Sequence, residues 1–129
     1  MNLIKKIVDK NKDHAAWRQI IHAHPELAYQ EYVTAQFVAD KLESFGITIV
    51  RGLGKTGVVG TIKSGSSDRS IGLRADMDAL PLTEMNTFSH RSKNTGVMHA
   101  CGHDGHTAML LAAAPVSYTH LTLPTKRIV

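Results

Sequence analysis

Residues 99–114 read HACGHDGHTAMLLAAA and join a ligand-rich loop to an apolar helix. Three histidines, the single cysteine of the 129-residue chain and one aspartate fall within the first eight of these positions. Because a run of apolar residues follows the loop, the sequence predicts a helix from about Asp104 onwards. The two glycines of the loop permit backbone conformations that other residues resist, so Cys101 and His103 can converge on one point.

The rest of the chain predicts helical segments followed by extended ones. Apolar residues at helical spacing indicate two helices, at about residues 2–22 and 30–45. Short apolar runs between glycine-rich turns indicate three strands, at residues 47–50, 58–63 and 71–75. The third run, IGLRA, is apolar enough for a buried central strand, and a polar loop is expected to follow it up to residue 105. This order favours an α/β architecture in which helices flank a mixed sheet.

The composition excludes several classes of protein. Hydrophobic residues make up 43% of the chain and charged residues 20%, as in a globular domain. The formal net charge is +4, but the basic residues are scattered and aromatic residues are few, which argues against nucleic-acid binding. A single cysteine cannot form an internal disulfide, and no apolar stretch is long enough for a signal peptide or a membrane span. We therefore expect a cytoplasmic protein without a nucleic-acid or membrane partner.

Cys101 and His103 lie two positions apart, so both side chains can bind one transition-metal ion such as Zn²⁺. His106 follows three positions later and would share a helix face with His103. Two alternatives remain open at this point: a buried free cysteine beside incidental histidines, and a cysteine nucleophile with His103 as its base. Asp104 would either cap the helix or orient a ligand imidazole.

Asp76 and Asp78 directly follow the apolar run 71–75. The end of a central strand is where α/β folds place their sites, and side chains two apart on a strand point the same way. A turn before Pro81 would explain the two aspartates equally well.

Further polar residues lie near the end of the first predicted helix. His22, His24 and Glu26 surround a proline there and are expected to face solvent. Glu31 is expected to be a favourable charge at the start of the second helix. Trp17 is expected to lie in the core.

Four stretches occur in order and carry a family resemblance: HAHPELAYQEYVTAQFVADKLESFGI, GVVGTIKSG, IGLRADMDALPLTE and GVMHACGHDGHTAMLLAAA. Over about residues 14–114 the chain resembles the N-terminal part of the aminoacylase-like metallopeptidases. The most similar branch holds hippurate hydrolases, N-acyl-L-amino acid amidohydrolases and plant auxin-conjugate hydrolases. The resemblance implies part of a zinc-exopeptidase-like catalytic domain, truncated before the dimerisation domain. The parent protein would be a homodimer or homotetramer.

The same resemblance implies roles for the candidate site residues. Cys101 and His103 would bind metal and Asp78 would orient the site, with support from three residues that do not bind it: Asp76, Asp104 and His106. Two divalent ions, of Mn²⁺, Zn²⁺, Co²⁺ or Ni²⁺, would activate water to hydrolyse the amide bond of an N-acyl amino acid. The general-base glutamate of the family is missing from this chain, so the chain itself is expected to be inactive. A non-catalytic metal-binding module is the alternative.

The last stretch, VSYTHLTLPTKRIV at residues 116–129, differs from the rest. It resembles sequencing-adapter sequence translated as protein. We therefore expect residues 1–114 to be the N-terminal part of the metallo-amidohydrolase catalytic domain and residues 115–129 to be a non-native tail. Pro115 is expected to end the final helix.

Overall fold

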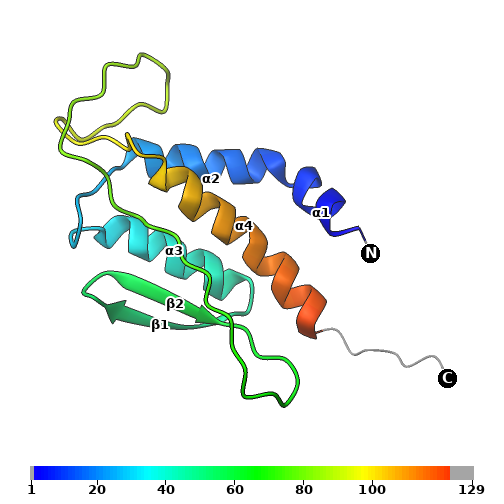
Figure 1. Ribbon diagram of the computed structural model, residues 1–129. Helices are drawn as coiled ribbons and strands as arrows, with labels where there is room; N and C mark the ends of the chain where they lie inside the picture. The colour runs from blue at the N-terminus through cyan, green and yellow to red at the C-terminus, as the bar shows by residue number, and fades with distance from the viewer. Residues whose placement is uncertain (1, 123–129) are drawn as a thin grey trace.

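The computed structural model of the chain describes residues 2–122. Its elements are, in chain order, α1 (Leu3–Asp9), α2 (Asn11–Ala23), α3 (Tyr32–Ser44), β1 (Thr48–Leu53), β2 (Gly57–Thr61) and α4 (His103–Thr122). Figure 1 shows α4 between α2 and α3, with the β1–β2 hairpin on the other side of α3. Helices and a small antiparallel sheet therefore form the layered α/β arrangement that the sequence predicts.

The helix expected over residues 2–22 is divided at Lys10 into α1 and α2. Asn2 caps α1 by accepting the backbone N–H of Lys5 at 3.0 Å, but α1 buries none of its residues. In contrast, α2 buries its last three residues. The break falls in the polar middle of the expected helix, where few tertiary contacts hold successive turns together.

The start of α3 is fixed by the carboxylate of Glu26. This carboxylate accepts the backbone N–H groups of Val33 at 2.9 Å and Thr34 at 2.7 Å, which are two of the donors left free at a helix start. Glu26 is therefore not the solvent-facing residue expected from the sequence. Its own carbonyl accepts the N–H of Ala79 at 2.8 Å, so the turn before α3 also holds the segment that leads to residues 76–78.

The hydrophobic core lies where α3, α4 and the start of the hairpin meet. Its buried cluster consists of Val38, Leu42, Ile47 and Leu111, and Trp17 of α2 packs against it. Val38 and Leu42 lie on the α3 face that the helical spacing predicts. Burial of each aliphatic side chain contributes about 1.5–3 kcal/mol, so this cluster is the main apolar link between the helices and the hairpin.

The hairpin packs closely against this core. β1 and β2 pair antiparallel, with Thr48 opposite Thr61. A methyl group placed on Gly60 would come within 3.0 Å of Ile47 and 3.2 Å of Leu42. A side chain at that position of β2 would therefore require these two core residues to shift by a few tenths of an ångström.

Residues 71–75 do not form the buried central strand that their apolar sequence predicts. The segment has no regular secondary structure, and Ile71 and Leu73 are 90% and 71% exposed. Within residues 2–122 the only sheet is the two-stranded hairpin, so the expected mixed sheet is not seen there. A strand needs neighbours that take up its backbone hydrogen bonds, and no described segment pairs with residues 71–75.

α4 continues through Pro115 to Thr122, so the expectation that this proline ends the helix is wrong. Pro115 has no N–H for the carbonyl of Leu111, but the ring of Tyr118 packs against the core cluster and lies against Gly46, which supports the turns that follow. Residues 123–129 of the expected tail lie outside the described residues. No described helix, α4 included, has the length and apolar character needed to cross a membrane.

The substitution Leu111→Ala should lower the free energy of unfolding by about 2–5 kcal/mol, because it leaves a cavity in the core cluster. Leu111 is 3% exposed, whereas Met109 on the same helix is 63% exposed. Met109→Ala should therefore change stability by no more than about 0.5 kcal/mol. Urea unfolding of both variants measures the difference, and equal losses would contradict this placement of the core.

Candidate metal centre

The first turn of α4 is joined to the segment 76–78 by two side chains. The hydroxyl of Thr107 donates to the carbonyl of Asp76 at 2.8 Å. Nδ1 of His103 lies 2.9 Å from the carboxylate and 3.0 Å from the carbonyl of Asp78. Although the expected strand before it is absent, this segment therefore lies against the helix that begins at His103.

Asp76, His103 and His106 form a group that could hold a metal ion, since one ligand atom from each lies within 4.8 Å of the others. Nε2 of His103 is 3.8 Å from the nearer oxygen of Asp76, and the two imidazole rings are 5.5 Å apart between centroids. One carboxylate and two imidazoles are donors suited to Zn²⁺, Mn²⁺ or Co²⁺. These residues therefore fit the divalent metal that the sequence predicts.

Asp78 fixes the orientation of His103. Its carboxylate accepts the Nδ1–H, which leaves Nε2 directed towards Asp76. Histidines that bind metal commonly donate their other ring N–H to a carboxylate in this way, because the contact sets the tautomer and raises the basicity of the ligand. The role of Asp78 as the residue that orients the site stays a prediction, and this contact would serve that role.

Cys101 is not a member of this group. Its side chain is exposed and forms no disulfide, and Gly102, with a φ of +89°, separates it from His103. The sequence predicts that Cys101 and His103 bind the metal ion together, with Asp76 and His106 in support. In the described residues it is Asp76 and His106 whose ligand atoms lie near His103.

Asp104 points away from this group, towards α2. It is 1% exposed, and its carboxylate lies 2.8 Å from Nδ1 of His22 and 3.1 Å from Nε of Arg18. Of the two roles predicted for Asp104, the helix cap is not seen because α4 already begins at His103, and the imidazole that its carboxylate contacts is that of His22. Adjacent helical residues point in directions about 100° apart, so His103 and Asp104 face different partners.

His22 connects Asp104 to Glu84, a residue that the sequence analysis does not identify. Nε2 of His22 lies 2.8 Å from the Glu84 carboxylate, and the His22 side chain is 4% exposed. The expectation that His22 faces solvent is therefore wrong, whereas His24 is exposed. One pattern in the sequence indicates that His22 has a polar partner: Arg18 and His22 are four residues apart and share a helix face.

Both carboxylates of this network are held ionised. Burial raises the pKa of Glu84, but hydrogen bonds from His22, Asn86 and the backbone of Ser92 outweigh it and lower the pKa from 4.5 to about 2. Burial likewise raises the pKa of Asp104, and the hydrogen bond from His22 and the nearby charge of Arg18 help to hold it below its usual value. Charge pairing therefore outweighs desolvation at both groups.

His99 lies beside this network and is buried. It is 4% exposed, and neither of its ring nitrogens has a hydrogen-bond partner among the described residues. Burial lowers its pKa despite the opposing charge of Asp104. Its ring centroid lies 6.2 Å from that of His22, so the histidine-rich loop places one imidazole inside the fold and His103 at the candidate metal centre.

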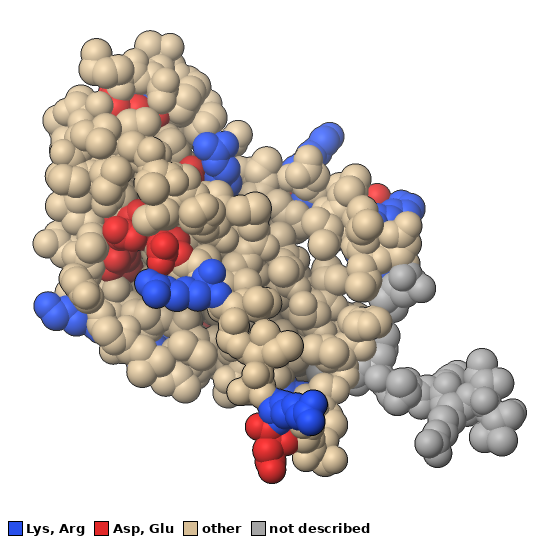
Figure 2. All heavy atoms as spheres, viewed as in Figure 1, with Lys and Arg blue, Asp and Glu red and all other residues tan. Residues whose placement is uncertain are grey.

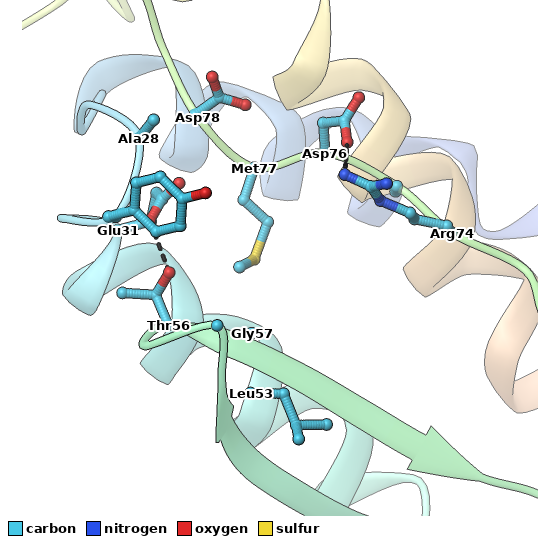
Figure 3. Close-up of a pocket in the computed structure, with 12 residues that line it drawn as sticks. Ala28, Glu31, Leu53, Thr56, Gly57, Arg74, Asp76, Met77 and Asp78 are labelled. Carbon is cyan, nitrogen blue, oxygen red and sulfur yellow. Dashed lines mark hydrogen bonds and ion pairs between the residues drawn. The ribbon is translucent and has the colours of Figure 1, made fainter.

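A cavity of about 380 Å³ adjoins the candidate metal centre and shares Asp76 and Asp78 with it. Figure 3 shows Glu31 and Thr56 on the opposite side of the cavity, where the Thr56 hydroxyl donates to Glu31 at 2.6 Å. Glu31 is thus a buried, paired carboxylate rather than only a favourable charge at the start of α3. Tyr29 also lines the cavity, at a φ of +64° that non-glycine residues seldom adopt.

Charge is unevenly spread over the surface that Figure 2 shows. Lys and Arg side chains stand apart from one another on this face, whereas some of the acidic side chains lie together in a small group and others lie apart from it. Arg74 forms an ion pair with Asp76 at 3.0 Å, which places one cation at the edge of the cavity.

These features define a candidate metal centre of the kind that hydrolases use to activate water. Residues 72–124 match the family model described as Peptidase family M20/M25/M40. The chain is 54% identical over 114 residues to the hippurate hydrolase of Campylobacter jejuni subsp. jejuni serotype O:2, and the alignment covers 88% of this chain and 30% of that protein. It is also 54% identical over 114 residues to the N-acyl-L-amino acid amidohydrolase of Geobacillus stearothermophilus, with 88% and 31% covered.

The fold agrees with these similarities. The structure of Bacillus subtilis YXEP, described as a dinuclear metal binding peptidase from the M20 family, aligns with a TM-score of 0.81 and 38% identity over 86% of this chain and 32% of that one. Over residues 72–124 the chain is therefore similar to Peptidase family M20/M25/M40, and the relatives that it resembles are named as hydrolases and amidohydrolases. It spans about a third of the length of these relatives.

Stability should fall as the pH decreases from about 4.5 towards 2. Glu84 has an ordinary pKa of 4.5 and a folded value of about 2, so its contribution is complete above the first value and is lost as the pH falls through the second. Asp104, whose pKa is also lowered, acts in the same direction. Urea unfolding across this range measures the decline.

The variant Glu84→Gln should show a shallower decline, because the amide that replaces the carboxylate does not titrate. Glu43→Gln, on the exposed surface of α3, serves as the control. Identical slopes for Glu84→Gln and the unaltered chain would show that Glu84 is not held ionised by the fold.

Proposed function

We propose that residues 1–114 are part of the catalytic domain of a metal-dependent amidohydrolase, and that His103 is its central metal ligand. The observation that carries the proposal is the contact between Asp78 and Nδ1 of His103, which leaves Nε2 free among the ligand atoms of Asp76 and His106.

Residues of this chain would prepare the site for a divalent cation. His103 would bind through Nε2, Asp78 would hold the Nδ1 proton, and Thr107 would keep Asp76 in place through its carbonyl. When bound, the metal supplies a Lewis acid that lowers the pKa of a coordinated water. Cys101 is proposed as a further ligand on the strength of the family resemblance alone.

The proposed reaction is hydrolysis of the amide bond of N-acyl amino acids. The support is the names of the relatives, a hippurate hydrolase and an N-acyl-L-amino acid amidohydrolase, together with a cavity beside Asp76 and Asp78 large enough for a small molecule. Family resemblance places the general base, a glutamate, outside this sequence. We therefore expect the longer protein to be active and the 129-residue chain to hydrolyse none of these substrates.

Exposed apolar residues support the view that more chain packs against this part of the domain. Ile71 and Leu73 are largely exposed, and a groove beside Leu73 continues onto Met109 and Leu110 of α4. Apolar surface of this kind is normally covered in a complete domain. The remaining two thirds of the relatives' length is the proposed cover.

Isothermal titration of the metal-free 129-residue chain with Zn²⁺ tests the metal centre. The unaltered chain should bind the ion, and His103→Ala should weaken binding by more than the loss of about 10- to 100-fold expected for Asp78→Asn. His24→Ala is the matched control, because His24 is exposed and lies at the end of α2. The account would be wrong if His103→Ala bound Zn²⁺ as tightly as the control.

A second pair of variants separates the two ligand sets. If Asp76, His103 and His106 hold the ion, His106→Ala should reduce Zn²⁺ affinity far more than Cys101→Ser. The opposite order would favour the pair Cys101 and His103 that the sequence predicts. Hydrolysis of hippurate by the full-length gene product, abolished by a chelator and by His103→Ala, tests the reaction itself.

A further inference from the structure

We propose that His22 is a positioning residue for the metal centre, which it serves by tying α2 to both ends of the loop 99–103. This inference rests on the proposed function, because it concerns the same metal site. Nδ1 of His22 contacts Asp104, which directly follows the loop. Nε2 of His22 contacts Glu84, and the hydrogen bonds of Glu84 lead to the residues that directly precede the loop.

The contacts of His22 join three parts of the chain that are far apart in sequence. Both are 2.8 Å long, and the side chains are 4%, 2% and 1% exposed for His22, Glu84 and Asp104 respectively. His22 is separated from Glu84 by 62 positions and from Asp104 by 82. Water cannot replace these contacts because the groups are buried, so the loop cannot shift at either end without breaking one of them.

The geometry of the imidazole explains why His22 suits this position. An imidazole carries its two nitrogens on different sides of the ring, and in His22 each of them lies 2.8 Å from a different carboxylate. Arg18 supplies a cation to Asp104 at 3.1 Å. Removal of His22 would leave the buried carboxylates of Glu84 and Asp104 without the side chain that they share, which is unfavourable.

The path from Glu84 to the loop runs through Ser92. The Glu84 carboxylate accepts the backbone N–H of Ser92, and the Ser92 hydroxyl donates to the carbonyl of Val97 at 2.7 Å. Met98 then exchanges two backbone hydrogen bonds with Leu80, at 2.9 and 3.0 Å. The chain therefore arrives at residue 99 in a position set by Glu84.

The path on the other side is shorter. Asp104 follows His103 directly in the first turn of α4, so the direction of Asp104 fixes the rotation of the helix about its axis. With Asp104 held on α2, His103 is turned towards Asp76 and Asp78. His22 thus restricts the metal loop from both ends without touching the residues proposed to bind the metal.

The test uses the 129-residue chain loaded with Co²⁺, whose visible absorption spectrum reports the geometry of its ligands. The variant His22→Gln keeps one amide donor but cannot donate to both carboxylates. It should bind Co²⁺ about 10- to 100-fold more weakly than the unaltered chain, with a changed spectrum at saturation. His24→Gln, two residues further on and exposed, should leave both affinity and spectrum unchanged.

Circular dichroism establishes whether His22→Gln is folded. If it is not, the milder variant Glu84→Gln decides the question, because it retains the contact between His22 and Asp104 and releases only the path through Ser92. Weaker Co²⁺ binding and a changed spectrum in the folded variant support the proposal, and unaltered affinity and spectrum overturn it.

The outcome also separates this inference from the proposed function. Loss of Co²⁺ binding in His103→Ala but not in folded His22→Gln would overturn the positioning role alone. Absence of Co²⁺ binding in the unaltered chain would overturn both the metal centre and the role of His22.

Discussion

The structure depends on the burial of the Asp104 carboxylate at the start of α4. This group is 1% exposed and is held by His22 and Arg18 of α2. Because neighbouring residues of a helix point in different directions, an inward Asp104 turns His103 towards the segment 76–78. One turn of helix thereby carries both the ion pairs that join it to α2 and the imidazole that faces the candidate metal centre.

Because Asp104 and His103 face different polar partners, polar residues are concentrated around the first turn of the otherwise apolar helix α4. Further along α4, Leu111 joins Val38, Leu42 and Ile47 in the core, so the helix is anchored by apolar contacts in its middle and by charge at its start. The cost of burying charge is offset because each carboxylate has a cationic or hydrogen-bonding partner. Among the buried polar side chains, His99 differs from these carboxylates, since neither of its ring nitrogens has a hydrogen-bond partner among the described residues.

The sequence predicted those features that depend on local pattern. The face of α3 that packs in the core followed from helical spacing. The two short motifs predicted Cys101 and His103 as ligands, with Asp76, Asp78, Asp104 and His106 in support, and of these Asp76 and His106 have ligand atoms near His103. Features that depend on distant contacts were missed. Glu84 stands 62 positions from His22, and no local pattern identifies such a partner.

The other differences between the predicted and the observed structure also depend on contacts between distant parts of the chain. The apolar run 71–75 has the composition of a central strand, but a strand also needs neighbours, and none pairs with it in residues 2–122. Pro115 does not end α4, because Tyr118 packs against the core beyond it. Local propensity was outweighed by tertiary contacts at Pro115, and the missing strand at residues 71–75 reflects contacts that the described part of the chain does not supply.

The central claim is that Asp78 holds one nitrogen of His103 so that the other can bind a divalent ion. The most direct measurement is anomalous X-ray scattering at the absorption edge of Zn²⁺ in crystals of the metal-loaded protein. The account predicts a peak at bonding distance from Nε2 of His103, with the Nδ1 contact to Asp78 intact. A peak at Nδ1, or one without contact to His103, would contradict it.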